Sequence, residues 1–256
     1  DFWNSDWAYP LAALVERHGR SFLLRGELVT LMGWFADLPE AIVERSAPLA
    51  VLHAWTLLLT GRLAEVEPRL QQTEQALPTS AIAGPAGDIY AIRAYLAAQQ
   101  NDVPRCIQMA GLALEHLGPQ QMAERGVVHF VLGGAHLLQG DIAAASQSMA
   151  TASKIGQKGN NLHVAVPALN ALASLQAQQG RLRQAYGTAQ EARRLATARS
   201  GRLLPMASSA ISELAEIDCE WNRLDDALAY AQQSIELGLR WGNAESLSND
   251  HLTLAQ

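Results

Sequence analysis

Seven histidines, two cysteines and a few paired acids are the residues of this chain that could do chemistry. Among the histidines, His129 and His136 share one face of an expected helix. They are seven positions apart, which is about 10.5 Å along a helix axis, whereas zinc holds its ligands at about 2 Å. Neither a His-Glu-x-x-His nor a Cys-x-x-Cys pattern occurs in the sequence. We therefore predict no metal site.

Nucleophilic and acid–base catalysis have equally little support. No Gly-x-Ser-x-Gly motif surrounds a serine, and the sequence has no Gly-x-x-x-x-Gly-Lys-Ser/Thr loop for phosphate. The acid pairs Asp225-Asp226 and Glu213/Glu216 are interpreted as helix caps and solvated helix faces. We predict no catalytic residue, no cofactor held by this chain and no enzyme activity, with a site assembled from distant positions as the open alternative.

Composition narrows the class of protein further. Hydrophobic residues make up 49% and charged residues 17%, a balance typical of globular proteins, and no apolar run approaches the roughly 18 residues of a membrane span. Two isolated thiols, Cys106 and Cys219, are typical of a reducing compartment, so we predict buried cysteines and a cytoplasmic location. The net charge of −6 disfavours broad nucleic-acid binding.

One stretch of the chain is basic against this acidic background, with a single acid, Glu191, inside it. It is interpreted either as a solvated helix face or as a docking patch for an acidic partner. Its members are Arg181, Arg183, Arg193, Arg194, Arg199 and Arg202.

The helices that would position any functional group are marked by a repeat. A Gly or Asn, one further residue and then an aliphatic residue recur at intervals of 40, 39, 40 and 42, and an earlier copy precedes these by 35. Gly and Asn accept the left-handed backbone that follows a helix end, so each mark predicts the tight turn of a helical hairpin. The marks are Gly26, Gly61, Asn101, Gly140, Gly180 and Asn222.

Small residues keep the same register around these turns. They stand seven positions before and five positions after each of the last five marks, where a small side chain allows two helix backbones to approach closely. We expect both sets to lie in the core of the hairpins. The first set is Ala54, Ala94, Gly133, Ala173 and Ala215, and the second is Val66, Cys106, Ala145, Ala185 and Ala227.

Together these patterns predict an all-α fold, a right-handed α-α superhelix of about six tetratricopeptide-like hairpins. The period of about 40 exceeds the usual value of about 34, and we place the extra residues in longer helices and in connections such as Pro78–Gly87 and Gly156–Asn161. Strand signals are nearly absent. We expect one domain over residues 1–256 that is a piece of a larger multidomain protein, cut inside a further repeat.

Residues 23–77 carry a resemblance to a known family. Their pattern is similar to the helical-repeat region of MalT-like, ATP-dependent LuxR-family transcription activators, also called LAL or STAND regulators. The residues that carry the similarity are Leu31, Trp34-Phe35, Leu38-Pro39, Pro48-Leu49, Ala54-Trp55 and the turn at Gly61.

The resemblance implies a role in regulation. In such a parent, an NTPase domain binds ATP, the superhelix senses an inducer or receives a partner, and a C-terminal helix-turn-helix binds DNA. This chain would then be a non-catalytic sensor and coupling module that meets a small-molecule inducer or a protein or peptide partner, and other domains of the same parent. DNA would be contacted only through the C-terminal domain. The alternative is a tetratricopeptide-like scaffold that binds a peptide or protein.

A ligand is expected in a concave groove lined by the first helix of each hairpin. Positions six and ten before each turn read aromatic and apolar in the N-terminal half and polar in the C-terminal half, as a ligand site requires. For the aromatic residues, packing between repeats is the open alternative. The candidates are Trp55, Tyr95, Phe130, Asn170, Ser174, Ser212 and Glu216.

Overall fold

The computed structural model describes residues 7–76, 85–198 and 200–241, and these are almost entirely α-helical. The chain divides into two compact units, Asp1–Val131 and Leu132–Gln256, with the division inside helix α9 (Met122–Leu138). The prediction of a single domain stays a prediction. Within the described ranges, no helix is both long enough and apolar enough to cross a bilayer.

The first unit is built from a short three-helix opening and two longer hairpins. Helix α4 packs against α1, α2, α3, α5 and α7, so it forms the centre of this unit. The helices before α9 are α1 (Ala8–Leu24), α2 (Leu28–Asp37), α3 (Glu40–Glu44), α4 (Ala47–Leu59), α5 (Leu63–Ala76), α7 (Ala86–Gln99) and α8 (Val103–His116).

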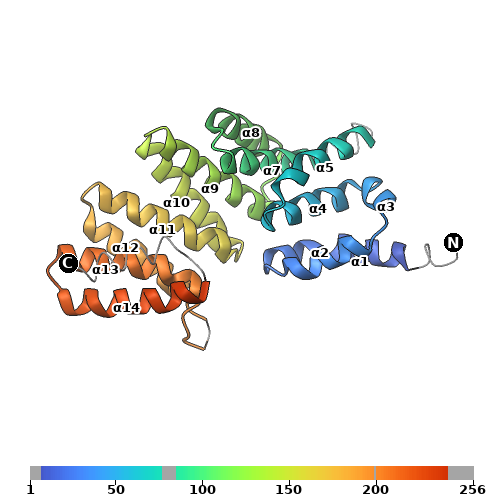
Figure 1. The fold of residues 1–256 in the computed structure, drawn as a ribbon. Coiled ribbons are helices and arrows are strands. Elements are labelled where there is room, and N and C mark those ends of the chain that lie inside the picture. The colour runs from blue at the N-terminus through green and yellow to red at the C-terminus, as the bar shows by residue number, and fades with distance from the viewer. Residues whose placement is uncertain (1–6, 77–84, 199, 242–256) are drawn as a thin grey trace. The chain divides into compact units, whose positions relative to one another are not determined.

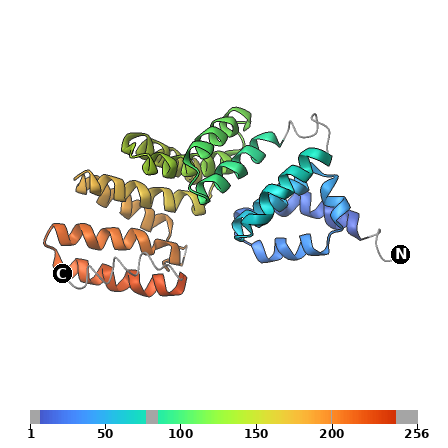
Figure 2. The same cartoon turned by 45° about the horizontal axis from the view of Figure 1, so that its top comes forward.

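The second unit continues as a row of hairpins. Helix α11 packs on α10, α12 and α13, and Figure 1 shows α10 to α14 as successive antiparallel neighbours, coloured from yellow to red. The turned view in Figure 2 shows the last pair, α13 and α14, again side by side. The helices after α9 are α10 (Ile142–Lys158), α11 (Leu162–Gln178), α12 (Leu182–Leu195), the short 3-10 helix η1 (Pro205–Ala207), α13 (Ser208–Glu220) and α14 (Leu224–Trp241).

The predicted turns are confirmed. All six marked positions adopt a left-handed backbone, for example Gly180 at φ 73° and Asn101 at φ 56°. At Gly180, the Arg181 N–H donates to Gln176 O at 2.9 Å and the Gly180 N–H donates to Ala177 O at 2.8 Å. This pair of hydrogen bonds satisfies carbonyls in the last turn of the helix, and the chain reverses direction at this point.

The residue after the turn decides how well the next helix is capped. Asp102 and Asp141 follow their turns directly, and each carboxylate accepts the N–H of the residue three positions on, Arg105 and Ala144 respectively. Where an arginine such as Arg181 stands in this position, no side chain caps the helix. The turn itself is therefore set by Gly or Asn, and the cap is an additional stabilising feature.

The register of small residues is confirmed as well. All ten positions are buried, and most of them are completely inaccessible. At Gly133, an added Cβ would lie 2.8 Å from Met149 Cε, so a larger side chain here would displace the Met149 side chain. Close approach of the helices thus explains why small residues recur with the repeat.

Three expectations need correction. The connection predicted over Gly156–Asn161 is shorter than expected, because α10 continues to Lys158 and α11 begins at Leu162. Gly156 lies inside α10 and is a close-contact residue whose added Cβ would lie 2.8 Å from Ala165 N. The other part of that prediction, longer helices, is confirmed, since α9, α10 and α11 have 17 residues each. Cys106 is buried as expected, but Cys219 is only partly buried. Part of Pro78–Gly87 lies outside the described residues, and α7 already begins at Ala86.

Candidate functional site

The predicted groove residues of the first unit are buried or half-buried. Trp55 belongs to the first unit and is only 5% exposed, and its indole N–H donates to Asp88 Oδ1 at 3.3 Å. Tyr95 and Phe130, also in the first unit, are half-buried. This favours core packing for Trp55. A groove that runs continuously through both units stays a prediction.

Trp55 is part of a buried polar network in the first unit. Arg20 donates to Asp88 Oδ1 at 2.9 Å and, through Nε, to Glu124 Oε1 at 2.8 Å, while the Gln121 amide donates to Asp88 Oδ2 at 3.0 Å. Asp88 and Glu124 are 4% and 6% exposed. Burial raises the pKa of Asp88, and the nearby Arg20 opposes that rise. Because an arginine compensates both carboxylates, the network ties α1, α7 and α9 together and leaves little to offer a ligand.

The second unit holds a pocket between α11 and α13. It has a volume of about 310 Å³, within the size range of small-molecule sites. Residues of α11 and of α13 line most of the pocket, and Leu137 near the end of α9 also lines it. Four of the predicted groove residues line this one pocket, namely Asn170, Ser174, Ser212 and Glu216.

Two polar atoms of this pocket have no hydrogen-bond partner among the described residues. They are Asn170 Oδ1 and Ser212 Oγ, both buried. Ser212 as a whole is 4% exposed. A buried polar atom without a partner costs on the order of 1–3 kcal/mol, so such atoms are rare unless a bound group satisfies them. Both residues line the pocket, so a polar group bound there is a candidate partner for these two atoms.

The charged residue of the pocket that sequence reasoning missed is Glu213. It was assigned with Glu216 to a solvated helix face, and this is wrong for Glu213, which lines the pocket and is half-buried. Burial, reinforced by the neighbouring Glu216 carboxylate, raises the pKa of Glu213 to about 7. The signal was present in the sequence, because Ser209, Glu213 and Glu216 have the spacing i, i+4, i+7 of one helix face.

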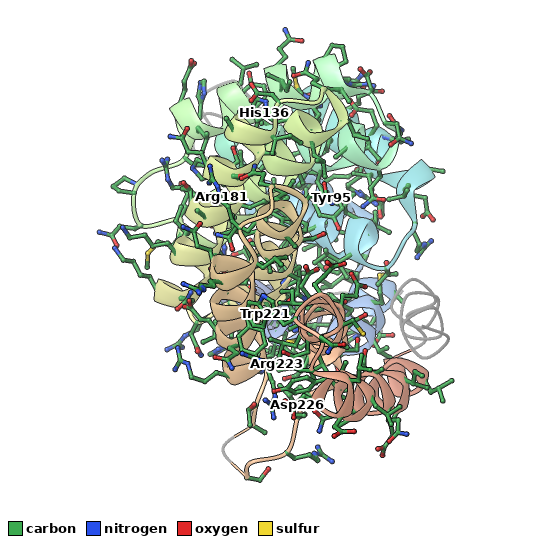
Figure 3. All side chains as sticks on the ribbon, turned by 90° about the vertical axis from the view of Figure 1, so that its left-hand side faces the viewer. Tyr95, His136, Arg181, Trp221, Arg223 and Asp226 are labelled. Atoms are coloured by element: carbon green, nitrogen blue, oxygen red, sulfur yellow. The ribbon has the colours of Figure 1, made fainter. Side chains whose placement is uncertain are left out.

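Another buried acid of α13 is neutralised by the protein itself. Asp218 is 1% exposed, and Arg223 from the turn before α14 reaches its Oδ1 at 3.5 Å while covering the Trp221 ring at 4.6 Å (Figure 3). Burial raises the pKa of Asp218, and Arg223 opposes the rise. By contrast, Asp225 and Asp226 are exposed in the first turn of α14, as their interpretation as solvated residues required.

The basic stretch borders a second, more open cavity of about 750 Å³ along α12. Arg193 and Arg194 line it, and the Arg193 guanidinium also lies 5.5 Å from the centre of the Tyr230 ring. Arg181, labelled in Figure 3, is exposed at the start of α12. Arg199 lies outside the described residues. Both interpretations of this stretch, solvated face and acidic-partner patch, remain compatible with these positions.

Comparison with known proteins decides the family. The model of the MalT-like TPR region matches residues 87–256, which include the whole pocket between α11 and α13. The chain belongs to the family of MalT-like TPR regions. The prediction that was made from residues 23–77 and from the repeat pattern is thereby confirmed.

The MalT-like chain has a regulator among its relatives. It is 25% identical over 230 residues to the HTH-type transcriptional regulator MalT of Vibrio cholerae, a match that covers 89% of this chain and 26% of the regulator. The chain thus spans about a quarter of the length of that relative.

Solved structures show the same repeat architecture. A Rap protein complexed with Competence and Sporulation Factor matches with a TM-score of 0.64 and 11% identity, covering 94% of this chain and 68% of the Rap chain. The APC/C hetero-tetramer Cut9–Hcn1 matches with a TM-score of 0.68 and 16% identity, covering 100% and 43%. At these identities the likeness concerns the fold, which is that of tetratricopeptide-like helical repeats.

Proposed function

We propose that this MalT-like TPR region is the sensor and coupling module of a transcription regulator, and that it binds its effector in the pocket between α11 and α13. The observation that carries the proposal is the pair of buried, unpartnered atoms, Asn170 Oδ1 and Ser212 Oγ, in a pocket of ligand size. Family membership supports the regulatory role. The module contributes binding, and it carries no chemistry of its own. As part of a regulator, it would act in the cytoplasm.

The position of the pocket suggests how binding is transmitted. Its walls belong to the first helices of two consecutive hairpins, α11–α12 and α13–α14, so a ligand that touches both walls favours one spacing of the hairpins. A ligand shifts an equilibrium only by its difference in affinity for the two states. If the parent carries the expected NTPase, ATP bound there and effector bound here must change each other's affinity by the same factor.

The proposal is tested with substitutions that fill the pocket, introduced into the gene that encodes this chain. Ala171→Trp places a large ring on the α11 wall, and Ala150→Trp is the matched control on an exposed face of α10. Messenger RNA is sequenced from cells grown on several carbon and nitrogen sources, with protein levels checked by immunoblot. A strain in which the gene is deleted gives the reference for loss of function. We expect the transcript profile of Ala171→Trp to match that of the deletion strain, and the profile of Ala150→Trp to match wild type. A stable Ala171→Trp protein with wild-type transcription in every condition would overturn the assignment of the pocket.

A protein-binding scaffold is the second candidate function. It is favoured by the solved relatives that were captured with partners, the Rap protein and Cut9. Such a scaffold would bind a protein or peptide without affecting transcription. The two candidates are separated by the same experiment, because a scaffold predicts an unchanged transcript profile for the deletion strain itself.

A further inference from the structure

The pocket between α11 and α13 is acidic and contains no positive charge from the described protein. Glu213 and Glu216 are the charged side chains that line it, and the lining residues from α9 and α11 are uncharged. No arginine, lysine or histidine is among the described residues that surround the space. This differs from the other buried acids, which have arginine partners, as Asp88 does with Arg20.

Two residues that line the same space, Asn170 and Ser212, each hold a buried polar atom without a hydrogen-bond partner among the described residues. Asn170 Oδ1 is an acceptor without a partner, and Ser212 Oγ, on a side chain that is 4% exposed, has no partner either. With the Glu213 carboxylate, they form a set of three oxygen-bearing groups from two helices, among the oxygen-bearing side chains that line the pocket. A primary ammonium carries three N–H donors and no acceptor, so its hydrogen-bonding capacity matches this set.

Part of the remaining surface of the pocket is aliphatic, beside the polar residues Ser174, Gln178 and Ser209. Leu137, Ala171 and Leu175 come from α9 and α11, and they offer contact to a hydrocarbon chain. The volume of about 310 Å³ suits one short alkyl chain with its head group and is small for a folded element. A basic side chain of a peptide and a free aliphatic amine present the same chemistry to such a space.

We propose that the pocket binds an aliphatic ammonium group, with Glu213 as its counter-ion, Ser212 and Asn170 as hydrogen-bond acceptors, and the leucines around its alkyl chain. This inference rests on the proposed function of the pocket and specifies its ligand. An anionic ligand would be repelled by two glutamates. A neutral polyol would satisfy the serine and the amide but would leave the half-buried Glu213 carboxylate uncompensated.

The pH dependence of binding follows from the same groups. Glu216 is the other charged group in the pocket, and together with burial it raises the pKa of Glu213 to about 7. Only the ionised carboxylate pairs with a cation, so affinity rises as pH increases through about 7 and then levels off. At pH 7 and below, binding the cation also releases the proton that Glu213 holds.

The test uses isothermal titration calorimetry on the whole 256-residue chain. The probe is 1,4-diaminobutane, with 1,4-butanediol as the uncharged counterpart and succinate as the anionic one. A second arm uses a blocked Gly-Lys-Gly peptide against the same peptide with an acetylated lysine. We expect one of the two amines to bind and its uncharged partner to fail. Tighter binding of the free diamine identifies a metabolite-like ligand, and tighter binding of the lysine peptide identifies a protein partner.

Variants locate the site. Glu213→Gln should weaken amine binding by about 10- to 100-fold, since a charged hydrogen bond is lost, and should remove the rise in affinity between pH 6 and pH 8. Glu220→Gln, an exposed change on the same helix, should leave affinity unchanged. Circular dichroism confirms that each variant is folded.

The possible outcomes separate this inference from the function on which it rests. If neither amine binds, or if Glu213→Gln binds as tightly as wild type, the cationic ligand is wrong. The pocket itself still stands in that case if Ala171→Trp abolishes the transcriptional response. If the amine binds through Glu213 but Ala171→Trp leaves transcription unchanged, the ligand assignment holds and the regulatory function of the pocket fails.

Discussion

The polar network of the first unit and the pocket of the second unit both hold carboxylates between helices, but these carboxylates are compensated differently. In the first unit, Arg20 reaches Asp88 and Glu124 and closes the network within the protein. In the pocket of the second unit, Glu213 sits beside a second glutamate with no basic lining residue in the described part of the chain. The same repeat therefore supports two uses of a buried acid. With an internal arginine the acid holds helices together, and without one it remains available to a ligand.

The largest effect on stability is expected from removing the positive charge of Arg20. Arg20→Met leaves Asp88 and Glu124 buried with no counter-charge, and it should lower the free energy of unfolding by about 2–3 kcal/mol, somewhat less than for a fully buried pair because Arg20 is half exposed. Urea denaturation followed by circular dichroism measures the loss, and Arg17→Met on the exposed face of α1 is the control.

The triple variant Arg20→Met, Asp88→Asn, Glu124→Gln sharpens this prediction. Removing the two charges along with the arginine should recover much of the stability, because uncompensated charge is the cause of the loss. Equal stability of the single and triple variants would show that Arg20 acts through packing, and the contrast between the two units would then lose its electrostatic basis.

The second prediction is an increase in stability, and it concerns Glu213 in the pocket. Glu213 has its pKa raised to about 7 when folded, so the folded state binds more protons than the unfolded state between the usual glutamate pKa and about 7. Stability contributed by this group therefore falls as pH rises through that window. Glu213→Gln removes the penalty and should stabilise the chain at pH 8 by about 1–2 kcal/mol, a figure reduced because water reaches the half-buried side chain.

Thermal denaturation at two pH values checks this expectation. The gain from Glu213→Gln should shrink when the pH is lowered to about 5, since the wild-type carboxyl is then protonated and uncharged. Glu220→Gln should show no such pH dependence. A loss of stability in Glu213→Gln at pH 8 would mean that the carboxylate is compensated by the protein, as Asp88 is in the first unit.

The smallest losses of stability are expected from removing helix caps, and they should be equal in the two units. Asp102 caps α8 in the first unit and Asp141 caps α10 in the second, with the same bond to the residue three positions on. Replacing either with alanine should cost about 1 kcal/mol, measured by urea denaturation. Clearly unequal costs would show that the units differ in their repeat architecture as well as in how they compensate buried acids.

The fold was predictable from the sequence because its determinants are local. A Gly or Asn at a helix end, such as Asn101, specifies the turn by its backbone preference alone, and the small residues in register with it specify the close helix contacts. The polar pocket was also predictable in part, since Asn170, Ser174, Ser212 and Glu216 follow from the turn register. Glu213 was missed because its spacing fits a solvated face equally well.

The network of the first unit could not be predicted. Arg20 is 68 positions from Asp88 and 104 positions from Glu124, and no periodicity links them. Whether a charged residue on a helix finds a counter-charge depends on which helices pack together, and the sequence pattern determines packing only between neighbours in the repeat. For the same reason, the burial of Trp55 against Asp88 appears only in the structure.

The claim that Glu213 is kept uncompensated for a cationic ligand is tested most directly by the titration of Glu213 itself. Carbon-13 NMR of the glutamate side-chain carboxyls, assigned with Glu213→Gln, gives its pKa in the free chain and in the presence of 1,4-diaminobutane. We predict that Glu213 titrates at about 7 in the free chain and that its pKa falls clearly when the diamine is bound. Titration near the ordinary glutamate value, unchanged by the diamine, would contradict the claim that the second unit keeps an uncompensated acid for a cationic ligand.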